Sequence, residues 1–243
     1  MIPVGDPSHR LGLILPAAGS STRMGDGPRK PLIEINGLPV LCHTLRRFRH
    51  LSSVEQVVVV AHPEDLDVWR RRYWPCLRDL GVTELVPGGG CRQESVARGL
   101  AALRPDIDIV LIHDSVRPFV SRTAIDEAVR AAIEHGAALV AMPLSDTVKR
   151  VSGDRVAETV SRADLWGAQT PQVFRHPLIR KALEAAFADG VEATDDAQLV
   201  ERLGGEVKIV RGSHLNLKLT TPEHIRLAEV MLGRREPATD NGS

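Results

Sequence analysis

Small, basic and acidic side chains gather in several short segments of the sequence, in combinations that suit phosphate chemistry. The first segment, residues 16–25, consists mostly of small residues. It contains Ala17, Ala18 and Gly19. Small side chains let backbone N–H groups approach a phosphate, and Arg23 with the nearby Lys30 can neutralise its charge. The segment is neither a Walker A motif nor a GxGxxG motif, so an ordinary strand-to-helix connection is the alternative.

Three glycines at residues 88–90 form a second candidate site, followed by a predicted helix start at residues 92–95. Glycines permit positive φ and close backbone approach, so the N–H of Gly89 and the hydroxyl of Ser95 are candidates for nucleotide binding. The alternative is a flexible loop in which Ser95 is an ordinary helix residue.

Asp114 and Arg117 follow a short apolar run and form a third candidate site. A carboxylate at the end of a central strand can hold Mg²⁺, directly or through water, or accept a hydrogen bond from a sugar hydroxyl. Arg117 can pair with a substrate phosphate. The alternative is a turn cap with a structural ion pair, and His113 is expected to be structural.

Further candidates lie in the C-terminal half. Thr147 and Arg162 flank a predicted hairpin, whose registry would bring a hydroxyl and a guanidinium together. Thr194 precedes a predicted helix and can belong to its N-cap. Lys218 alternates with apolar neighbours in residues 215–219, which predicts a short strand with Lys218 on its polar face. A solvated surface is the alternative for these side chains.

Alternating strands and helices are expected to position these segments. Apolar runs predict strands at residues 11–15, 54–61, 83–86, 107–112, 137–142 and 207–210. Helical spacing of apolar residues predicts helices between them, and further helices at 178–188, 197–203 and 222–232. Strands that are apolar along their whole length imply a mostly parallel sheet covered on both faces. The fold class is therefore predicted to be α/β, doubly wound and Rossmann-like.

Residues 143–174 interrupt the alternation. Two β-branched runs on either side of Gly153 predict a hairpin with a glycine turn. Such a hairpin has few core contacts of its own, so we expect it to project as an arm and to pack on a second copy, giving a homodimer. Packing on its own domain is the alternative. We predict a single domain over residues 1–233, with 143–174 as the arm and 234–243 as a polar tail.

The composition narrows the functional class. The 243 residues include 31 basic and 31 acidic side chains, so the formal net charge is zero, and only 3% are aromatic. Binding to nucleic acid is therefore not expected. We find no secretory signal and no apolar run long enough to span a membrane. The cysteines Cys42, Cys76 and Cys91 lie far apart in the sequence, which predicts reduced thiols and a cytoplasmic protein.

Taken together, the ordered segments resemble the 2-C-methyl-D-erythritol 4-phosphate cytidylyltransferases, within the wider family of nucleotidyltransferases that activate sugars and polyols. The resemblance runs through residues 16–19, Arg23, Lys30, 88–89, Ser95, 113–118, 146–149, 159–162, 169–172, 194–195 and 216–220. It implies that the phosphate of methylerythritol phosphate attacks the α-phosphorus of CTP and releases pyrophosphate, in non-mevalonate isoprenoid precursor biosynthesis. It also implies Mg²⁺ as the cofactor.

The resemblance also implies residue roles. Arg23 and Lys30 would stabilise charge at the α-phosphate, whereas Arg162 and Lys218 would hold the attacking phosphate. The nucleotide would be bound by Ala17, Ala18, Gly19, Gly89 and Ser95, and the polyol by Asp114, Arg117, Thr147 and Thr194. Asp114 is also the candidate for Mg²⁺, and the arm would reach a second subunit's site.

The chain departs from the family pattern at three places. Ser115 and Val116 replace the frequent Ala-Ala pair, Arg29 precedes Lys30 and rivals it as the catalytic cation, and Gly90 replaces an acidic residue of some members. A ribitol 5-phosphate cytidylyltransferase and a non-catalytic nucleotide-binding protein are the alternative functions. A glycosyltransferase would typically need a second acidic metal ligand near Asp114, which the sequence lacks.

Overall fold

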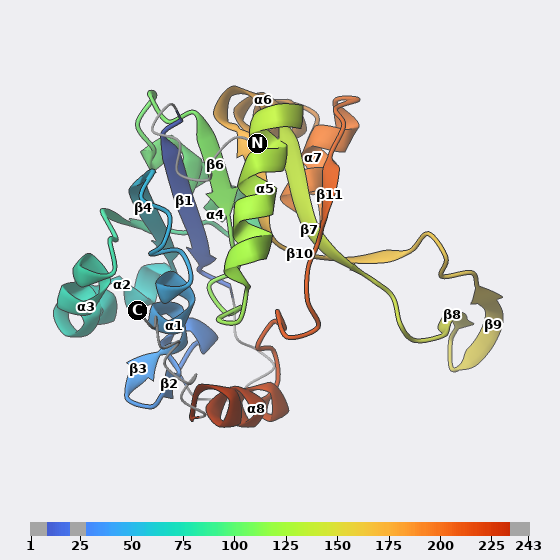
Figure 1. Cartoon of the computed structure of the whole chain (residues 1–243), viewed down its shortest axis with the longest axis horizontal. Coiled ribbons are helices and arrows are strands. Elements are labelled where there is room, and N and C mark those ends of the chain that lie inside the picture. Colours follow the sequence, from blue (N-terminus) through green and yellow to red (C-terminus); the bar gives the residue numbers. More distant parts are fainter. Residues whose placement is uncertain (1–8, 20–27, 234–243) are drawn as a thin grey trace, which may run out of the picture.

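A seven-stranded sheet forms the centre of the molecule in the computed structural model, which describes residues 9–19 and 28–233. Its strands are β1 (Leu11–Ala17), β4 (Val54–Ala61), β5 (Glu84–Pro87), β6 (Ile109–Ile112), β7 (Ala137–Pro143), β10 (Trp166–Arg175) and β11 (Lys208–Arg211). They lie in the order β11-β7-β10-β6-β1-β4-β5 (Figure 1). Only β10 is antiparallel to its neighbours in this sheet. The predicted mostly parallel α/β sheet is confirmed.

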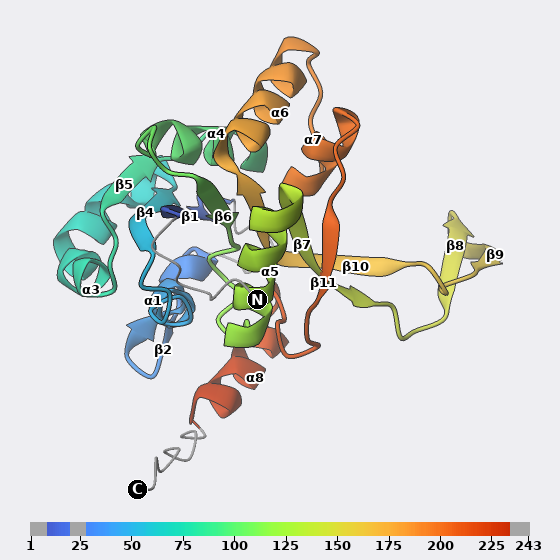
Figure 2. The ribbon, with the colours of Figure 1, turned by 45° about the horizontal axis from the view of Figure 1, so that its top comes forward.

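Helices cover both faces of this sheet because successive strand residues point to opposite sides. Leu13 and Leu15 pack in one core cluster with α1 (Val40–Arg46), α3 (Trp74–Asp79) and α5 (Arg122–His135). Ile14 packs in the second cluster with α4 (Arg92–Ala102), α6 (His176–Ala188) and α7 (Asp196–Arg202). Figure 2 shows α4 and α6 on one side of the sheet and α5 on the other.

Short elements complete the fold between the first two long strands and after β4. They are the 3₁₀ turn η1 (Lys30–Leu32), β2 (Glu34–Ile35), β3 (Leu38–Pro39), the 3₁₀ turn η2 (Pro63–Asp65), α2 (Leu66–Val68) and the π-helical turn η3 (Trp69–Tyr73). The C-terminal helix α8 (Pro222–Gly233) buries Ala228 in a third cluster with Ile35 and Leu219. No helix in the described part of the chain is both long and apolar enough to cross a bilayer.

The arm is shorter than predicted. Strands β8 (Val148–Ser152) and β9 (Arg155–Val160) form a two-stranded sheet of their own, which extends away from the rest of the molecule (Figure 1). The prediction assigned residues 143–174 to this arm, but Trp166–Arg175 forms β10 in the central sheet. This strand was not predicted because it contains Gly167 and Pro171, and neither residue favours a regular ladder of backbone hydrogen bonds. Its register shifts between Ala168 and Gln172, whereas Val173 and Phe174 are fully buried.

The predicted strand at residues 215–219 is wrong, because the structure has no strand there. The prediction placed Leu215 with the other apolar side chains on one face and Asn216 with Lys218 on the other. Instead Leu215 is 60% exposed and Asn216 is 1% exposed. The Asn216 amide donates to the backbone carbonyl of Thr170 at 2.9 Å, so a specific hydrogen bond outweighs the hydrophobic alternation.

Candidate active site

A cavity of about 440 Å³ opens at the carboxyl ends of the central strands. It is lined by residues 16–19 after β1, Lys30 and Pro31 of η1, His62 after β4, residues 89–92 and Ser95 at the start of α4, residues 114–116 after β6, Lys218 and Thr220. Open α/β sheets bind their ligands at this edge. Eight of the predicted site residues line this one space: Ala17, Ala18, Gly19, Lys30, Gly89, Ser95, Asp114 and Lys218.

The glycine loop is needed for close packing, and its glycines do not adopt positive φ. A Cβ on Gly88 would lie 2.2 Å from the Cβ of Ala18, and a Cβ on Gly89 would lie 2.3 Å from that of Glu94. The N–H of Gly89 donates to Oγ of Ser95 at 3.1 Å. Through this hydrogen bond the buried Ser95 orders the loop, and it also lines the cavity.

Asp114 is the electrostatic centre of the cavity. Its Oδ2 lies 3.0 Å from Nζ of Lys218 and 3.1 Å from Nε of Arg117, and its Oδ1 lies 3.8 Å from Nε of Arg92. Burial alone would raise the pKa of Asp114, but attraction to Lys218, Arg92 and Arg117 outweighs it and holds the pKa well below its usual range. The carboxylate is therefore ionised at neutral pH.

Arg92 connects this centre to a second buried carboxylate. Its Nη2 donates to Oδ2 of Asp196 at 2.6 Å, and Asp196 is 1% exposed. Burial disfavours the charge on Arg92, but Asp196 and then Asp114 raise its pKa above the usual value. Three cationic side chains thus face Asp114 and Asp196, and Asp195 also acts on Arg92, so the charges of this cluster nearly balance. Lys30 lines the same cavity and adds a cation that suits a phosphorylated ligand.

Hydrogen bonds beneath the cavity hold Asp114 and Lys218 in place. Nδ2 of Asn216 donates to the carbonyl of Thr170, and Nη1 of Arg117 donates to the carbonyl of Asn216 at 2.7 Å. The backbone N–H of Asp114 donates to Oγ1 of Thr170 at 3.0 Å. Arg117 therefore contributes by fixing Asp114 and does not itself line the cavity.

His113 is structural, as predicted. It is fully buried, with Nδ1 at 3.0 Å from Oγ1 of Thr170 and Nε2 at 3.1 Å from the carbonyl of Arg117. Burial lowers its pKa to about 4, so the ring is neutral at physiological pH.

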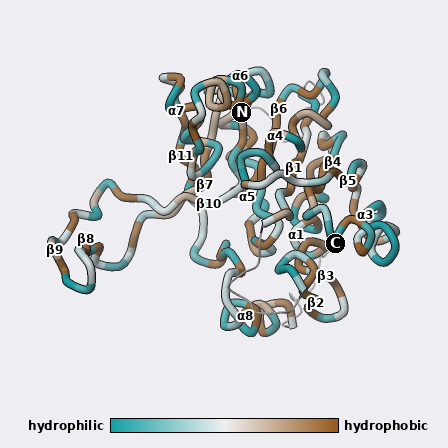
Figure 3. Tube along the Cα trace, turned by 180° about the vertical axis from the view of Figure 1, so that it is seen from behind, coloured by the Kyte–Doolittle hydropathy of each residue, from teal (hydrophilic) through white to brown (hydrophobic). Residues whose placement is uncertain are grey.

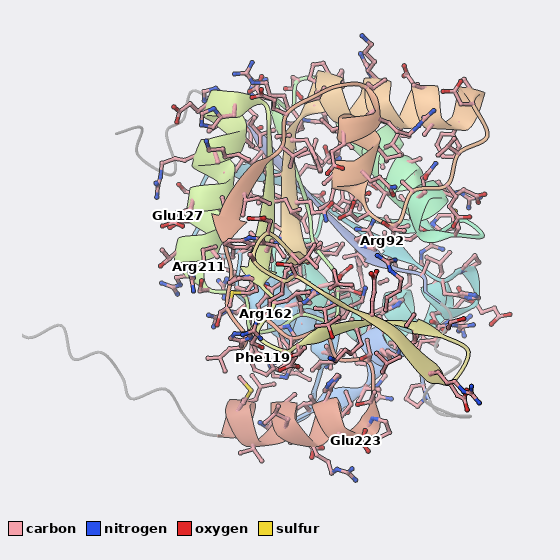
Figure 4. The ribbon with its side chains drawn as sticks, turned by 90° about the vertical axis from the view of Figure 1, so that its right-hand side faces the viewer. Arg92, Phe119, Glu127, Arg162, Arg211 and Glu223 are labelled. Carbon is pink, nitrogen blue, oxygen red and sulfur yellow. The ribbon has the colours of Figure 1, made fainter. Side chains whose placement is uncertain are left out.

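The remaining predicted residues lie elsewhere. Arg23 falls outside the described residues. Thr194 is exposed, and its hydroxyl donates to the side chain of Gln198 at 3.2 Å. Thr147 and Arg162 lie just beyond the last paired residues of the arm, and both are exposed. None of these three described residues lines the cavity. Figure 4 labels Arg162 beside the arm and Arg92 at the start of α4.

Several cavity residues were not predicted as site residues, among them His62, Cys91, Arg92 and Thr220. Arg92 and Asp196 could each have been found from the sequence, since both stand at the start of a predicted helix. Nothing in the sequence indicates that the two side chains pair. The proximity of two cysteines was likewise not predictable from the sequence. Sγ of Cys42 and Sγ of Cys76 lie 3.5 Å apart as free thiols. Among the residues that the structure covers, no three His, Cys, Asp or Glu side chains group as metal ligands.

Comparisons with known proteins identify the family of this chain. The family model of 2-C-methyl-D-erythritol 4-phosphate cytidylyltransferase matches residues 11–234. The proteins of that name from Bacillus pumilus and Pelotomaculum thermopropionicum are each 43% identical to this chain, over 90% and 93% of it and 96% of their own length.

Solved structures agree as well. The chain is similar to a 4-diphosphocytidyl-2C-methyl-D-erythritol synthase from Anaerococcus prevotii, with a TM-score of 0.80, 32% identity and coverage of 93% of this chain and 99% of that one. The 2-C-methyl-D-erythritol 4-phosphate cytidylyltransferase from Thermus thermophilus gives a TM-score of 0.77 and 34% identity, with coverage of 91% and 98%. The chain therefore belongs to the 2-C-methyl-D-erythritol 4-phosphate cytidylyltransferase family of nucleotidyltransferases.

Proposed function

We propose that the protein transfers CMP from CTP to 2-C-methyl-D-erythritol 4-phosphate, forming 4-diphosphocytidyl-2-C-methyl-D-erythritol and pyrophosphate for isoprenoid precursor synthesis. One observation carries the proposal beyond family membership. Lys30 and Lys218 reach the same cavity from segments far apart in the sequence, and Lys218 lies beside Asp114 and Arg117. Two phosphorylated substrates repel each other, so a cavity with cations from two segments suits their union.

The reaction needs no covalent enzyme intermediate. A phosphate oxygen of the polyol phosphate attacks the α-phosphorus of CTP, a new P–O bond forms, and the bond to the β-phosphate oxygen breaks. Lys30, with Arg23 by family resemblance, stabilises the charge that grows at the α-phosphate. Lys218 holds the attacking phosphate in line, and its ion pair with Asp114 at 3.0 Å orients its ammonium group.

The nucleotide is assigned to the small-residue side of the cavity. Residues 17–19 and 89 carry little or no side chain, so the base and ribose can approach the backbone closely. Ser95 holds this loop in place. The polyol is assigned to the side of Asp114, with Arg117 supporting that carboxylate.

Mg²⁺ is proposed as the cofactor, but Asp114 does not fit as its direct ligand. Three cations already surround that carboxylate, and a divalent cation would be repelled by them. We infer that Mg²⁺ is held by the triphosphate oxygens and by water, as is common where phosphates supply the ligands. When bound, it would neutralise part of the triphosphate charge.

Thr147 and Arg162 at the base of the arm are assigned to the polyol site of a second copy in a homodimer, and Thr194 before α7 is assigned to the polyol side by family resemblance. The arm extends away from the rest of the chain (Figures 1 and 3). Val151 and Val156 on it are 63% and 61% exposed. Exposed apolar side chains on a projecting hairpin support packing against a second copy. A cytoplasmic location is supported by the three free thiols.

A pyrophosphate-release assay tests the function. Purified protein is incubated with CTP, Mg²⁺ and either 2-C-methyl-D-erythritol 4-phosphate or ribitol 5-phosphate. We expect release with the first polyol phosphate and little with the second. Release with ribitol 5-phosphate alone would replace the proposed substrate, and no release with either would refute the activity.

A further inference from the structure

Arg29 joins two walls of the cavity. It directly precedes Lys30, and its guanidinium reaches η2, which follows β4. Nη1 donates to Oδ1 of Asp65 at 2.7 Å, and Nη2 donates to Oε2 of Glu64 at 2.6 Å. Nη2 also lies 3.3 Å from Nε2 of His62, which lines the cavity. One side chain thus connects the segment that carries Lys30 with the segment that carries His62.

Asp65 is the contact that fixes Arg29. The side chains of Arg29 and Asp65 are 23% and 12% exposed, so their ion pair is largely shielded from water. The side chain of Glu64 is 75% exposed, and an exposed pair of this kind contributes little. A shielded, charge-assisted hydrogen bond holds its geometry better than a solvated one.

Arg29 does not have the surroundings expected of a side chain that binds a phosphate directly. Two carboxylates already neutralise its charge, and the cavity is lined by Lys30 and not by Arg29. Glu64 and Asp65 would also repel an approaching phosphate at this point. The geometry therefore favours an indirect role.

We propose that Arg29 is a positioning residue, which, through its ion pair with Asp65, holds the η1 segment so that Lys30 faces the triphosphate of CTP. This proposal rests on the proposed function, because it takes CTP as the ligand of this wall. It gives Arg29 and Asp65 a shared effect on CTP and none on the polyol phosphate.

A double-mutant cycle tests the proposal. Arg29→Ala and Asp65→Ala are each expected to raise KM for CTP roughly tenfold, and the double variant is expected to show the same rise. KM for the polyol phosphate should stay unchanged in all three, and Arg29→Lys should recover part of the loss. Arg202→Ala is the matched control, since it breaks an Arg–Asp pair with Asp189 at 2.8 Å outside the cavity. It should leave both KM values unchanged.

Three results would overturn the positioning role. They are an Asp65→Ala variant with normal KM for CTP, single effects that multiply in the double variant, and equal increases in KM for both substrates. Arg29→Lys and Asp65→Asn provide a second cycle if the alanine variants do not fold.

Direct measurement of CTP binding without the polyol separates this proposal from the proposed function. A wild-type protein that binds CTP but releases no pyrophosphate would refute the reaction, while weaker CTP binding by the variants would still support the positioning role. A protein that does not bind CTP at all would refute both.

Discussion

Adjacent residues in this site have different surroundings. Lys30 lines the cavity, whereas the neighbouring guanidinium of Arg29 is engaged by Asp65 and Glu64. Charge alone does not distinguish these two cations. Their roles follow from which of the two faces the space that the substrates would occupy, since Lys30 lines the cavity and Arg29 does not.

Replacement of Lys30 should therefore impair chemistry more than replacement of Arg29. Lys30→Ala is expected to raise KM for CTP at least as much as Arg29→Ala and also to lower kcat by about a hundredfold, because a cation at the triphosphate both binds CTP and stabilises the transition state. Arg29→Ala should lower kcat far less. Steady-state pyrophosphate release at saturating CTP measures both. Equal losses of kcat would show that Arg29 shares the direct role.

His113 should make stability depend on pH. Burial lowers its pKa to about 4 from 6.5, so the unfolded chain takes up a proton first as the pH falls. The free energy of unfolding should therefore drop between pH 6.5 and pH 4, by roughly 3 kcal/mol from this residue, and level off below. Urea unfolding across this range measures the slope. His113→Gln should flatten it, and a parallel slope in that variant would exclude His113 as the cause.

At the scale of elements, the loop before α4 must pack against the loop after β1. The N–H of Gly88 donates to the carbonyl of Ala61 at 2.7 Å, and Ala18 occupies the space that a side chain at residue 88 would need. These contacts set the distance between the two loops assigned to the nucleotide.

A single methyl group should disturb this packing. In Gly88→Ala the new Cβ would lie 2.2 Å from the Cβ of Ala18, so the two loops must separate. We expect CTP binding to weaken by at least about tenfold, with a smaller effect on the polyol phosphate. Calorimetric titration with CTP measures this. Gly233→Ala is the control, because a Cβ there meets nothing within 4 Å. Unchanged CTP affinity in Gly88→Ala would show that the loop spacing is not critical.

At the scale of the whole molecule, the arm extends away from the rest of its own chain (Figure 1). Thr147 and Arg162 lie at its base and do not line that cavity. If they act on the polyol phosphate, the site must be completed by a second copy. A homodimer mass on gel filtration is expected, and a monomer mass would refute the shared site.

Mixed dimers provide a sharper measurement. Arg162→Ala should chiefly raise KM for the polyol phosphate, and Lys30→Ala should abolish most turnover. In a shared-site dimer, one of the two sites of a mixed dimer combines the intact Lys30 of one chain with the intact Arg162 of the other. Coexpression of the two variants should therefore restore activity above that of either alone. No restoration in a verified mixed dimer would place both residues in the same chain's site.

The sequence by itself determined the alternation of strands and helices and the loops that carry the chemistry. The predicted strand at residues 54–61 is β4 (Val54–Ala61), and Lys30, Asp114 and Lys218 line one cavity as candidates for one site. These features follow from local patterns, because a strand's apolar run and a loop's position after it are set by neighbours in the chain.

Only the tertiary structure decided which distant groups meet. The pair of Arg92 with Asp196 joins residues 104 positions apart, and Asn216 leaves the predicted strand to bind the carbonyl of Thr170. Strand β10 was not predicted because it contains glycine and proline. Its place in the sheet depends on its pairing with β6 and β7. Such contacts depend on distances in the folded chain, and no local pattern encodes them. The separation of Arg29 from Lys30 belongs to the same class, because carboxylates beyond β4 decide it.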